Sequence, residues 1–368
     1  MITLCPDDLA NLGALLQRIN ATAHGQVIPR DFKPIVEEAA RLQFFDLPAM
    51  PRQDDEPDLF RFWNALFSDP LEFVHGDLSY AAPPTANFQT VGAVAQRTRQ
   101  LSSLNWSGAS ITPRDGGMFT DVFATWTVPE VQVPPAGDEH IQYKSSCWVG
   151  LDGQRSYPDS TLPQIGTEHG INKPTLPEGD HYSVWIQWWP IPELTIAGLP
   201  VTHGERVFCW LTAISYTRVR CIIKIANDIG RTQRFYLDAP RINYTPPLLE
   251  CIQARISGAT AQWIAEAPTN SQTEQIFPLP DYGTVTFEQC HAISARDPRT
   301  VTEDFLAEDP LNPPPPARLE DLIGPTLIHM YKVVRAPGRR VTISKGERPV
   351  NIIAGVEHID RVKTTFVK

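Results

Sequence analysis

The chain has 368 residues, with 32 Lys and Arg against 42 Asp and Glu, so its formal net charge is -10. This acidic balance leaves no positive surface for wrapping nucleic acid and excludes that class of partner. A hydrophobic fraction of 42% excludes wholesale disorder. Proline, with 35 residues, is about twice as frequent as in an average protein, which favours strands, turns and ordered loops over long helices.

The first 80 residues have helical spacing. Apolar residues recur every three or four positions in residues 6–20, 31–45 and 55–67, and each stretch begins near a proline or an acidic residue. We therefore expect residues 1–80 to form a helical N-terminal segment, either a pro-segment or an appendage, and residues 81–103 to form a linker. The chain shows no signal peptide and no apolar run of ~18 residues, so we expect a cytoplasmic protein without a membrane partner.

From residue 104 the pattern changes to the alternation of apolar and polar residues that is typical of strands. We expect strands at residues 119–128, 143–151, 181–189, 206–213, 218–226, 232–237, 259–266, 283–287, 326–334 and 350–367. Many short strands separated by turns predict an all-β fold, an antiparallel two-sheet β-sandwich over residues 104–368. Four consecutive prolines at 313–316 predict a stiff, extended loop over residues 308–318.

Cysteine and histidine give no sign of a metal site, and we expect neither a metal nor a cofactor. The six cysteines are far apart and form no CxxC pair, so we expect buried free thiols rather than disulfides. His140 and His169 lack a second ligand at metal-binding spacing and are expected to be ordinary surface or loop residues. The sequence also contains no GxSxG elbow, HExxH helix, GxGxxG motif or Walker loop.

Two of the expected strands carry polar residues on an otherwise apolar surface. Alternation places Trp185, Gln187 and Trp189 on one face, opposite residues 182, 184, 186 and 188. Since both faces are aromatic and only one needs to face the core, the other is a candidate wall of a binding groove. In residues 261–266 the same rule exposes Glu266 on a face with apolar neighbours, as either a paired structural carboxylate or one with a tuned proton affinity.

Six short motifs occur in order between residues 103 and 291. They are NWSGA at 105–109, TWTVP at 125–129, WVGLDG at 148–153, LPQIG at 162–166, WIQWWP at 185–190 and AQWIAE at 261–266. In their order and approximate spacing they resemble the glutamic peptidases, or eqolisins. The resemblance implies a concanavalin- or jelly-roll-like β-sandwich with a substrate groove across one concave sheet, and a metal-independent endopeptidase that cleaves exposed polypeptides. Because members of that family are secreted, a secreted location is the alternative to the cytoplasmic one.

The resemblance assigns a catalytic dyad to Gln164 and Glu266. Glu266 is expected to take a proton from the water that attacks the peptide carbonyl and to return it to the leaving amine. Gln164 cannot ionise, so its amide N–H is expected to donate to the developing oxyanion. The residues expected to bind substrate are Trp148, Asp152, Glu168, Trp185, Gln187 and Trp189.

This chain departs from the family at two positions, where Gln187 and Gln262 replace glutamates. Gln262 is about 13 Å from Glu266 along a strand, too far to change its charge state much. If Gln187 lies beside the dyad, the missing negative charge lowers the proton affinity of Glu266. We therefore expect an active enzyme with a changed acid-pH profile, which a Gln187→Glu variant alters.

Two other functions remain open at this stage. One is a catalytically weak β-sandwich protein that binds peptides or glycans through its aromatic groove. The other is a jelly-roll glycoside hydrolase, which needs two facing carboxylates about 5 to 10 Å apart, with Asp152 or Glu168 as a candidate second acid. The sequence predicts neither the cleavage preference nor the oligomeric state.

Overall fold

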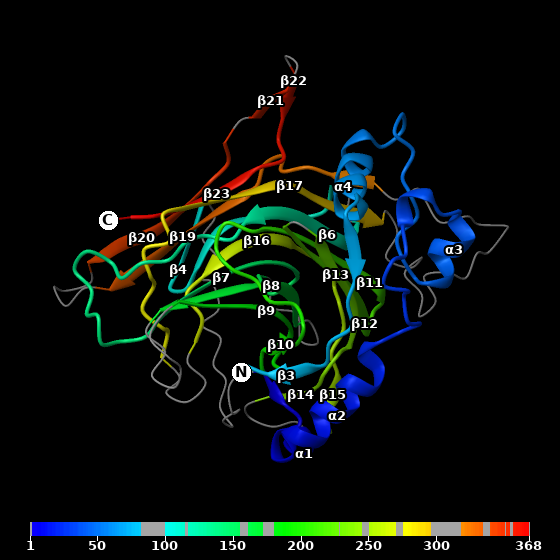
Figure 1. Ribbon diagram of the computed structural model, residues 1–368. Coiled ribbons are helices and arrows are strands. Elements are labelled where there is room, and N and C mark those ends of the chain that lie inside the picture. The colour runs from blue at the N-terminus through cyan, green and yellow to red at the C-terminus, as the bar shows by residue number, and fades with distance from the viewer. Residues whose placement is uncertain are drawn as a thin grey trace.

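The computed structural model describes residues 2–81, 100–114, 117–154, 161–171, 180–227, 229–244, 250–269, 275–295, 318–333, 339–349, 351–353 and 356–367. Its strands form two large sheets that enclose a common core, with helices in the N-terminal segment (Figure 1). The expected all-β sandwich is therefore confirmed. Most of the expected linker and all but the last residue of the proline-rich loop lie outside the described residues.

The first sheet is antiparallel except for β2, which runs parallel to β13. Its strands, in spatial order, are β2 (Leu71–Phe73), β13 (Gly230–Asp238), β12 (Arg218–Ala226), β11 (Arg206–Ser215), β6 (Met118–Thr127), β17 (Thr284–Ala295) and β18 (Arg318–Glu320).

The second sheet carries the motif-bearing strands. Its order is β3 (Leu78–Tyr80), β10 (Leu194–Ile196), β9 (Asp180–Trp189), β8 (Leu162–Ile171), β7 (Tyr143–Leu151), β16 (Ala261–Glu266), β5 (Trp106–Ile111), β19 (Thr326–Val333), β20 (Arg340–Glu347) and β23 (Val362–Phe366). Strand β4 (Gln100–Ser103) runs parallel to β19. The long strand β17 joins the sheets, because residues 284–287 pair with β23 and residues 288–295 pair with β6.

Four short strands lie outside these sheets. Strands β1 (Ile2–Leu4), β14 (Arg241–Tyr244) and β15 (Ile252–Gln253) form a small sheet, and β21 (Asn351–Ile353) pairs with β22 (Val356–His358).

The main core lies between the two sheets. Val184, Ile186 and Trp188 point into it from β9, and Trp263 does so from β16. The opposite face of the second sheet carries a separate apolar cluster that includes Trp148, Trp185 and Ile264. The alternation predicted for β9 and β16 is thus confirmed, and it turns the polar residues of both strands away from the core.

Residues 28–73 of the N-terminal segment cover the outer face of the first sheet, whereas Leu15, Ile19 and Ala23 pack into the main core (Figure 1). The segment contains α1 (Pro6–Ala10), α2 (Leu12–Ala23), the 3₁₀ helix η1 (Pro34–Val36), α3 (Ala39–Phe44) and α4 (Pro57–Phe67). It is not purely helical, since β1, β2 and β3 also come from it. None of the described helices is both long and apolar enough to cross a membrane.

Helix α4 fastens this segment to the sheet through buried aromatic side chains. Phe62 packs against Phe123 at a ring-centroid distance of 4.5 Å and against Trp210 at 5.8 Å. Beside them Lys224 Nζ donates to the carbonyl oxygens of Ala65 and Ser68, both at 3.1 Å. Because the end of α4 supplies these carbonyls, the ammonium group on the sheet is satisfied under the segment.

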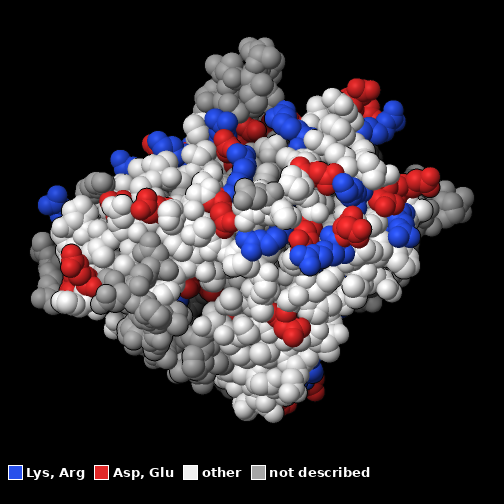
Figure 2. Space-filling view, viewed as in Figure 1, with Lys and Arg blue, Asp and Glu red and all other residues white. Residues whose placement is uncertain are grey.

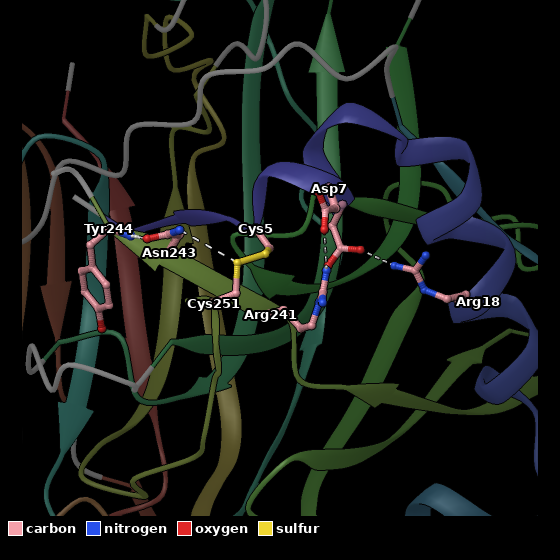
Figure 3. Close-up of a disulfide and its surroundings, with 8 residues drawn as sticks. Cys5, Asp7, Arg18, Arg241, Asn243, Tyr244 and Cys251 are labelled. Carbon is pink, nitrogen blue, oxygen red and sulfur yellow. Dashed lines mark hydrogen bonds and ion pairs between the residues drawn. A yellow bond between two sulfur atoms is a disulfide. The ribbon is translucent and has the colours of Figure 1, made fainter. Parts of the chain in front are cut away.

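A disulfide between Cys5 and Cys251 ties the start of the chain to the small sheet (Figure 3). Next to it Arg241 reaches Asp8 at 3.3 Å, and Asp8 also pairs with Arg18. The expectation of six free thiols is therefore wrong for this pair, because β1 pairs with β14 and brings the two cysteines together across 246 positions of sequence. The four other cysteines are buried and free: Cys147, Cys209, Cys221 and Cys290.

Candidate active site

The outward face of β9, β8, β7 and β16 collects nearly all of the expected site residues. The ladder register defines three rows across these strands. The first row is Gln187, Gln164, Gly150 and Gln262; the second is Trp185, Gly166, Trp148 and Ile264; the third is Ser183, Glu168, Ser146 and Glu266. We call this surface the groove face. Figure 2 shows a hollow in the face of the molecule that is turned to the viewer, with acidic side chains inside it.

Trp148 lies at the centre of the groove face and is fully buried. Two glycines make room for it. A Cβ atom at Gly166 would lie 2.7 Å from the Trp148 Cβ, and one at Gly150 would lie 3.1 Å from the edge of the indole. Any larger residue at these two positions would therefore displace Trp148, whose strand β7 lies between β8 and β16.

Glu266 is held by donors from β7 and from the residue directly before β5. Trp148 Nε1 donates to Glu266 Oε2 at 2.8 Å, and Asn105 Nδ2 donates to Glu266 Oε1 at 3.0 Å. Burial raises the pKa of Glu266 to about 7, and it outweighs the hydrogen bonds from Trp148, Trp106 and Asn105, which favour the charged form. Part of the side chain remains accessible to solvent. The result is a carboxyl group that exchanges its proton near neutral pH.

Gln164 is buried and held by Gln187 on the adjacent strand. Gln164 Nε2 donates to Gln187 Oε1 at 2.5 Å, and Gln187 Nε2 donates to the carbonyl oxygen of Ile191 at 2.8 Å. Gln187 therefore lies beside Gln164, and strand β7 separates the strands of these two residues from β16, which carries Glu266. The lowered proton affinity expected at Glu266 from the neutral Gln187 is not the dominant effect, because burial raises that pKa.

Gln164 and Glu266 share the groove face but do not hydrogen-bond to each other. Gln164 is level with Gly150, whereas Glu266 is level with Ser146, so the two are offset by four residues along the strands. This offset is about 13 Å at the backbone. The Trp148 side chain occupies the row between them.

The groove face also carries buried polar atoms without partners. Within the described part of the chain, the indole nitrogens of Trp185 and Trp189 make no hydrogen bond, and neither do the amide oxygens of Gln164 and Gln262. Buried polar groups in folded proteins are nearly always paired, and each exception calls for an explanation. The groove face thus has both hydrogen-bond donors and hydrogen-bond acceptors without partners.

The two remaining expected acids are already engaged. Glu168 is on the groove face, but Lys144 Nζ lies 2.8 and 2.7 Å from its two oxygens. Burial lowers the pKa of Lys144, yet the charges of Glu168 and Glu193 raise it above its ordinary value overall. Asp152, at the end of β7, instead accepts hydrogen bonds from Ser257 and Ala259 and so fixes the loop that enters β16.

Two residues near Glu266 were not expected as site residues. Asn105 and Trp106 appear in the sequence only as part of a motif, yet Asn105 binds the Glu266 carboxyl and Trp106 pairs with Glu266 across the ladder. Ser103 Oγ donates to Asn105 Oδ1 at 3.2 Å and leaves the amide N–H pointing at Glu266. A polar residue directly before a buried strand is the signal that points to such a role.

His169 is a correction to the sequence analysis. It is fully buried in β8 rather than in a surface loop, with Ser145 Oγ at 3.2 Å and Thr167 Oγ1 at 2.8 Å from its ring nitrogens. Burial lowers the pKa of His169 to about 3, so the ring is neutral. Across the described part of the chain, no three His, Cys, Asp or Glu residues cluster closely enough to hold a metal ion.

A statistical model of the Peptidase A4 family matches residues 104–306, which is more than half of the chain. The chain belongs to the Peptidase A4 family. It is thus a member of a family of enzymes that hydrolyse peptide bonds. The matched range contains β5 to β17 and hence every residue of the groove face named above.

Several solved structures are similar to the chain, although no curated protein sequence matches it. A scytalido-glutamic peptidase with a transition-state analogue inhibitor is 16% identical, covers 72% of this chain and 98% of its own, and has a TM-score of 0.45. For SCP-B, an eqolisin in complex with the tripeptide Ala-Ile-His, the values are 16%, 72%, 98% and 0.41. For aspergilloglutamic peptidase from Aspergillus niger they are 15%, 61%, 99% and 0.39.

Proposed function

We propose that the protein is a glutamic-type endopeptidase that cleaves exposed polypeptide segments with Glu266 and Gln164. The observation that carries the proposal is the state of Glu266, a carboxyl group held by Trp148 and Asn105 whose pKa burial raises to about 7. A general base works best when its pKa lies near the working pH. Membership of the Peptidase A4 family supports the reaction class.

The chemistry follows from the two side chains. As a carboxylate, Glu266 takes a proton from a water molecule that attacks the peptide carbonyl, work that typically contributes ~10²- to 10⁴-fold in rate. It then returns the proton to the leaving amine. Gln164 has a second amide N–H besides the one bound to Gln187, and this N–H is available to the oxyanion, a contribution of about 3 kcal/mol. No step requires a metal or a cofactor.

The offset between the two residues fits a substrate between them rather than a preformed contact. The unpaired indole nitrogens and amide oxygens of the groove face supply donors and acceptors, and an extended peptide backbone presents both complementary groups. Binding of a peptide gives these buried atoms hydrogen-bond partners and so offsets the free-energy penalty of burying them unpaired.

The two earlier alternatives are less well supported. A glycoside hydrolase needs a second free carboxyl group facing Glu266, but Glu168 is neutralised by Lys144 and Asp152 binds a loop. A binding protein without catalysis does not need a carboxyl group whose pKa is raised to about 7. The Cys5–Cys251 disulfide favours an oxidising compartment, and hence the secreted rather than the cytoplasmic location.

Cleavage of an unstructured protein from about pH 2 to 8 tests the proposal. We expect the wild-type protein to cleave it, with kcat/KM rising towards a plateau around a midpoint near pH 7. Glu266→Gln and Gln164→Ala should each lose activity by ~10²-fold or more. Glu130→Gln, which makes the same change at an exposed acid, is the matched control and should keep full activity. Cleavage that survives Glu266→Gln would overturn the assignment.

A further inference from the structure

Gln187 uses both ends of its side-chain amide, and this fixes the direction of a chain of hydrogen bonds. The carbonyl oxygen of Ile191 can only accept, so Gln187 must present its Nε2 to it, at 2.8 Å. Its Oε1 is then left for Gln164, which must in turn present Nε2, at 2.5 Å. One backbone carbonyl therefore decides the orientation of two amides.

The carbonyl that anchors this chain is itself firmly held. The Ile191 amide donates to the carbonyl oxygen of Trp188 at 2.9 Å, and the Ile191 side chain is buried in the main core. At the other end, Gln164 is 5% exposed, and its Oε1 is left without a partner. This series of hydrogen bonds thus turns the Gln164 oxygen away from Gln187 and leaves the second N–H of Gln164 as the donor for a ligand.

We propose that Gln187 is a positioning residue that orients the Gln164 amide, and that its own amide keeps this orientation unchanged from acid to neutral pH. The inference rests on the function proposed for Gln164. An amide donates and accepts at every pH, because it neither gains nor loses a proton in this range. A carboxyl group at position 187 makes both bonds only while it is protonated, and once ionised it faces the Ile191 carbonyl with acceptors alone.

The charged groups around Gln187 are engaged with other partners. On β8 and β7, Glu168 and Lys144 form an ion pair with each other, and on β16 Glu266 binds Trp148 and Asn105. Asp152 holds the loop at 257–259, and Glu193, in the turn before β10, contributes to the charge environment of Lys144. The strand on the other side, β10, places the uncharged Leu194 and Thr195 against β9. Both hydrogen bonds of Gln187 are therefore made with uncharged groups, the Gln164 amide and the Ile191 carbonyl.

The test compares Gln187→Glu with the wild-type protein in the cleavage assay at each pH from 3 to 8. We expect the ratio of the two kcat/KM values to be close to one below about pH 4, where the added carboxyl is protonated. It should fall by roughly tenfold or more by pH 7, mainly through kcat, because a misoriented oxyanion donor weakens transition-state binding. Taking the ratio removes the part of the Glu266 titration that both proteins share, and the uncharged Gln187→Met variant separates the effect of the added charge on Glu266 from the loss of the two hydrogen bonds.

Two further variants keep the test decisive. Gln187→Met, which removes both hydrogen bonds without adding charge, should lose activity by a similar factor at every pH. Gln132→Glu adds the same charge at an exposed site and should leave the ratio at one throughout. A ratio for Gln187→Glu that does not change with pH, or a fully active Gln187→Met, would overturn the inference. Failure of the proposed function is distinct, because the wild-type protein itself would then show no Glu266-dependent cleavage.

Discussion

The outer faces of the two sheets are both aromatic, but they are completed in different ways. On the first sheet, Phe123 and Trp210 are covered by α4, and Lys224 finds carbonyl partners at the end of that helix. On the second sheet, Trp185 is also buried and Trp189 partly buried, yet among the described residues their indole nitrogens have no partner. Where the chain covers its own sheet it also supplies the hydrogen bonds, so the unpaired donors of the groove face indicate a surface prepared for another molecule.

The same comparison bears on the N-terminal segment. Among the described residues it packs into the main core and against the outer face of the first sheet, and it joins the edges of both sheets through β2 and β3, rather than lying across the groove face. We therefore infer that it is a permanent part of the fold, and that activity does not depend on its removal. This favours the appendage over the pro-segment.

The largest expected effect comes from opening the covered face. Phe62→Ala removes a fully buried ring that packs against Phe123 and Trp210, so it should lower the free energy of unfolding by about 3 to 5 kcal/mol. The kcat/KM of the folded protein should not change. Trp185→Phe on the groove face is the matched variant, with a smaller loss of stability but a raised KM. Urea unfolding measures the stability and cleavage kinetics measure KM, and an equal rise in KM in the two variants would contradict the division of roles.

A second prediction concerns the disulfide that ties the start of the N-terminal segment to the small sheet. Cys5→Ser combined with Cys251→Ser should lower the free energy of unfolding by about 2 to 4 kcal/mol, because the open chain has more freedom when unfolded. The ion pair of Arg241 with Asp8 and the pairing of β1 with β14 remain, so the folded protein should still cleave substrate. Wild-type protein treated with a reductant should match the double variant, whereas the untreated double variant should not respond to the reductant.

The strands show which parts of the fold the sequence predicts. Strands β7 and β12 begin and end where the alternation indicates. Strand β8 was not expected, because Pro163, Gly166 and Gly170 interrupt it with residues that strands avoid. Gly166 is there because a Cβ atom would meet the Cys147 carbonyl oxygen at 2.1 Å. The close approach of β7 at Cys147 and Trp148 thus requires a glycine that hides the strand carrying Gln164.

The candidate site was predictable only in part for a similar reason. Motifs pointed to Gln164 and Glu266, and alternation correctly placed Trp185 and Gln187 on one face. The contact of Asn105 with Glu266 joins residues 161 positions apart and depends on how β5 registers with β16. The anchoring of Gln187 on the Ile191 carbonyl depends on the shape of a turn, and neither is visible in residue types alone.

The smallest expected effect is the change in the free energy of unfolding with pH that the buried Glu266 causes. In the folded protein the pKa of Glu266 is raised to about 7, against 4.5 for an ordinary glutamate, so between these values the folded state holds more protons than the unfolded chain. Stability linked to this group is therefore complete below about pH 4.5 and is lost as the pH rises through 7. Partial contact of the side chain with solvent limits the loss to roughly 1 to 2 kcal/mol. Urea unfolding of wild type and Glu266→Gln at several pH values should show the two curves diverging between pH 4.5 and 7, since the amide cannot ionise. Parallel curves would mean that burial does not raise the pKa of Glu266, and they would contradict its proposed role as a general base near neutral pH.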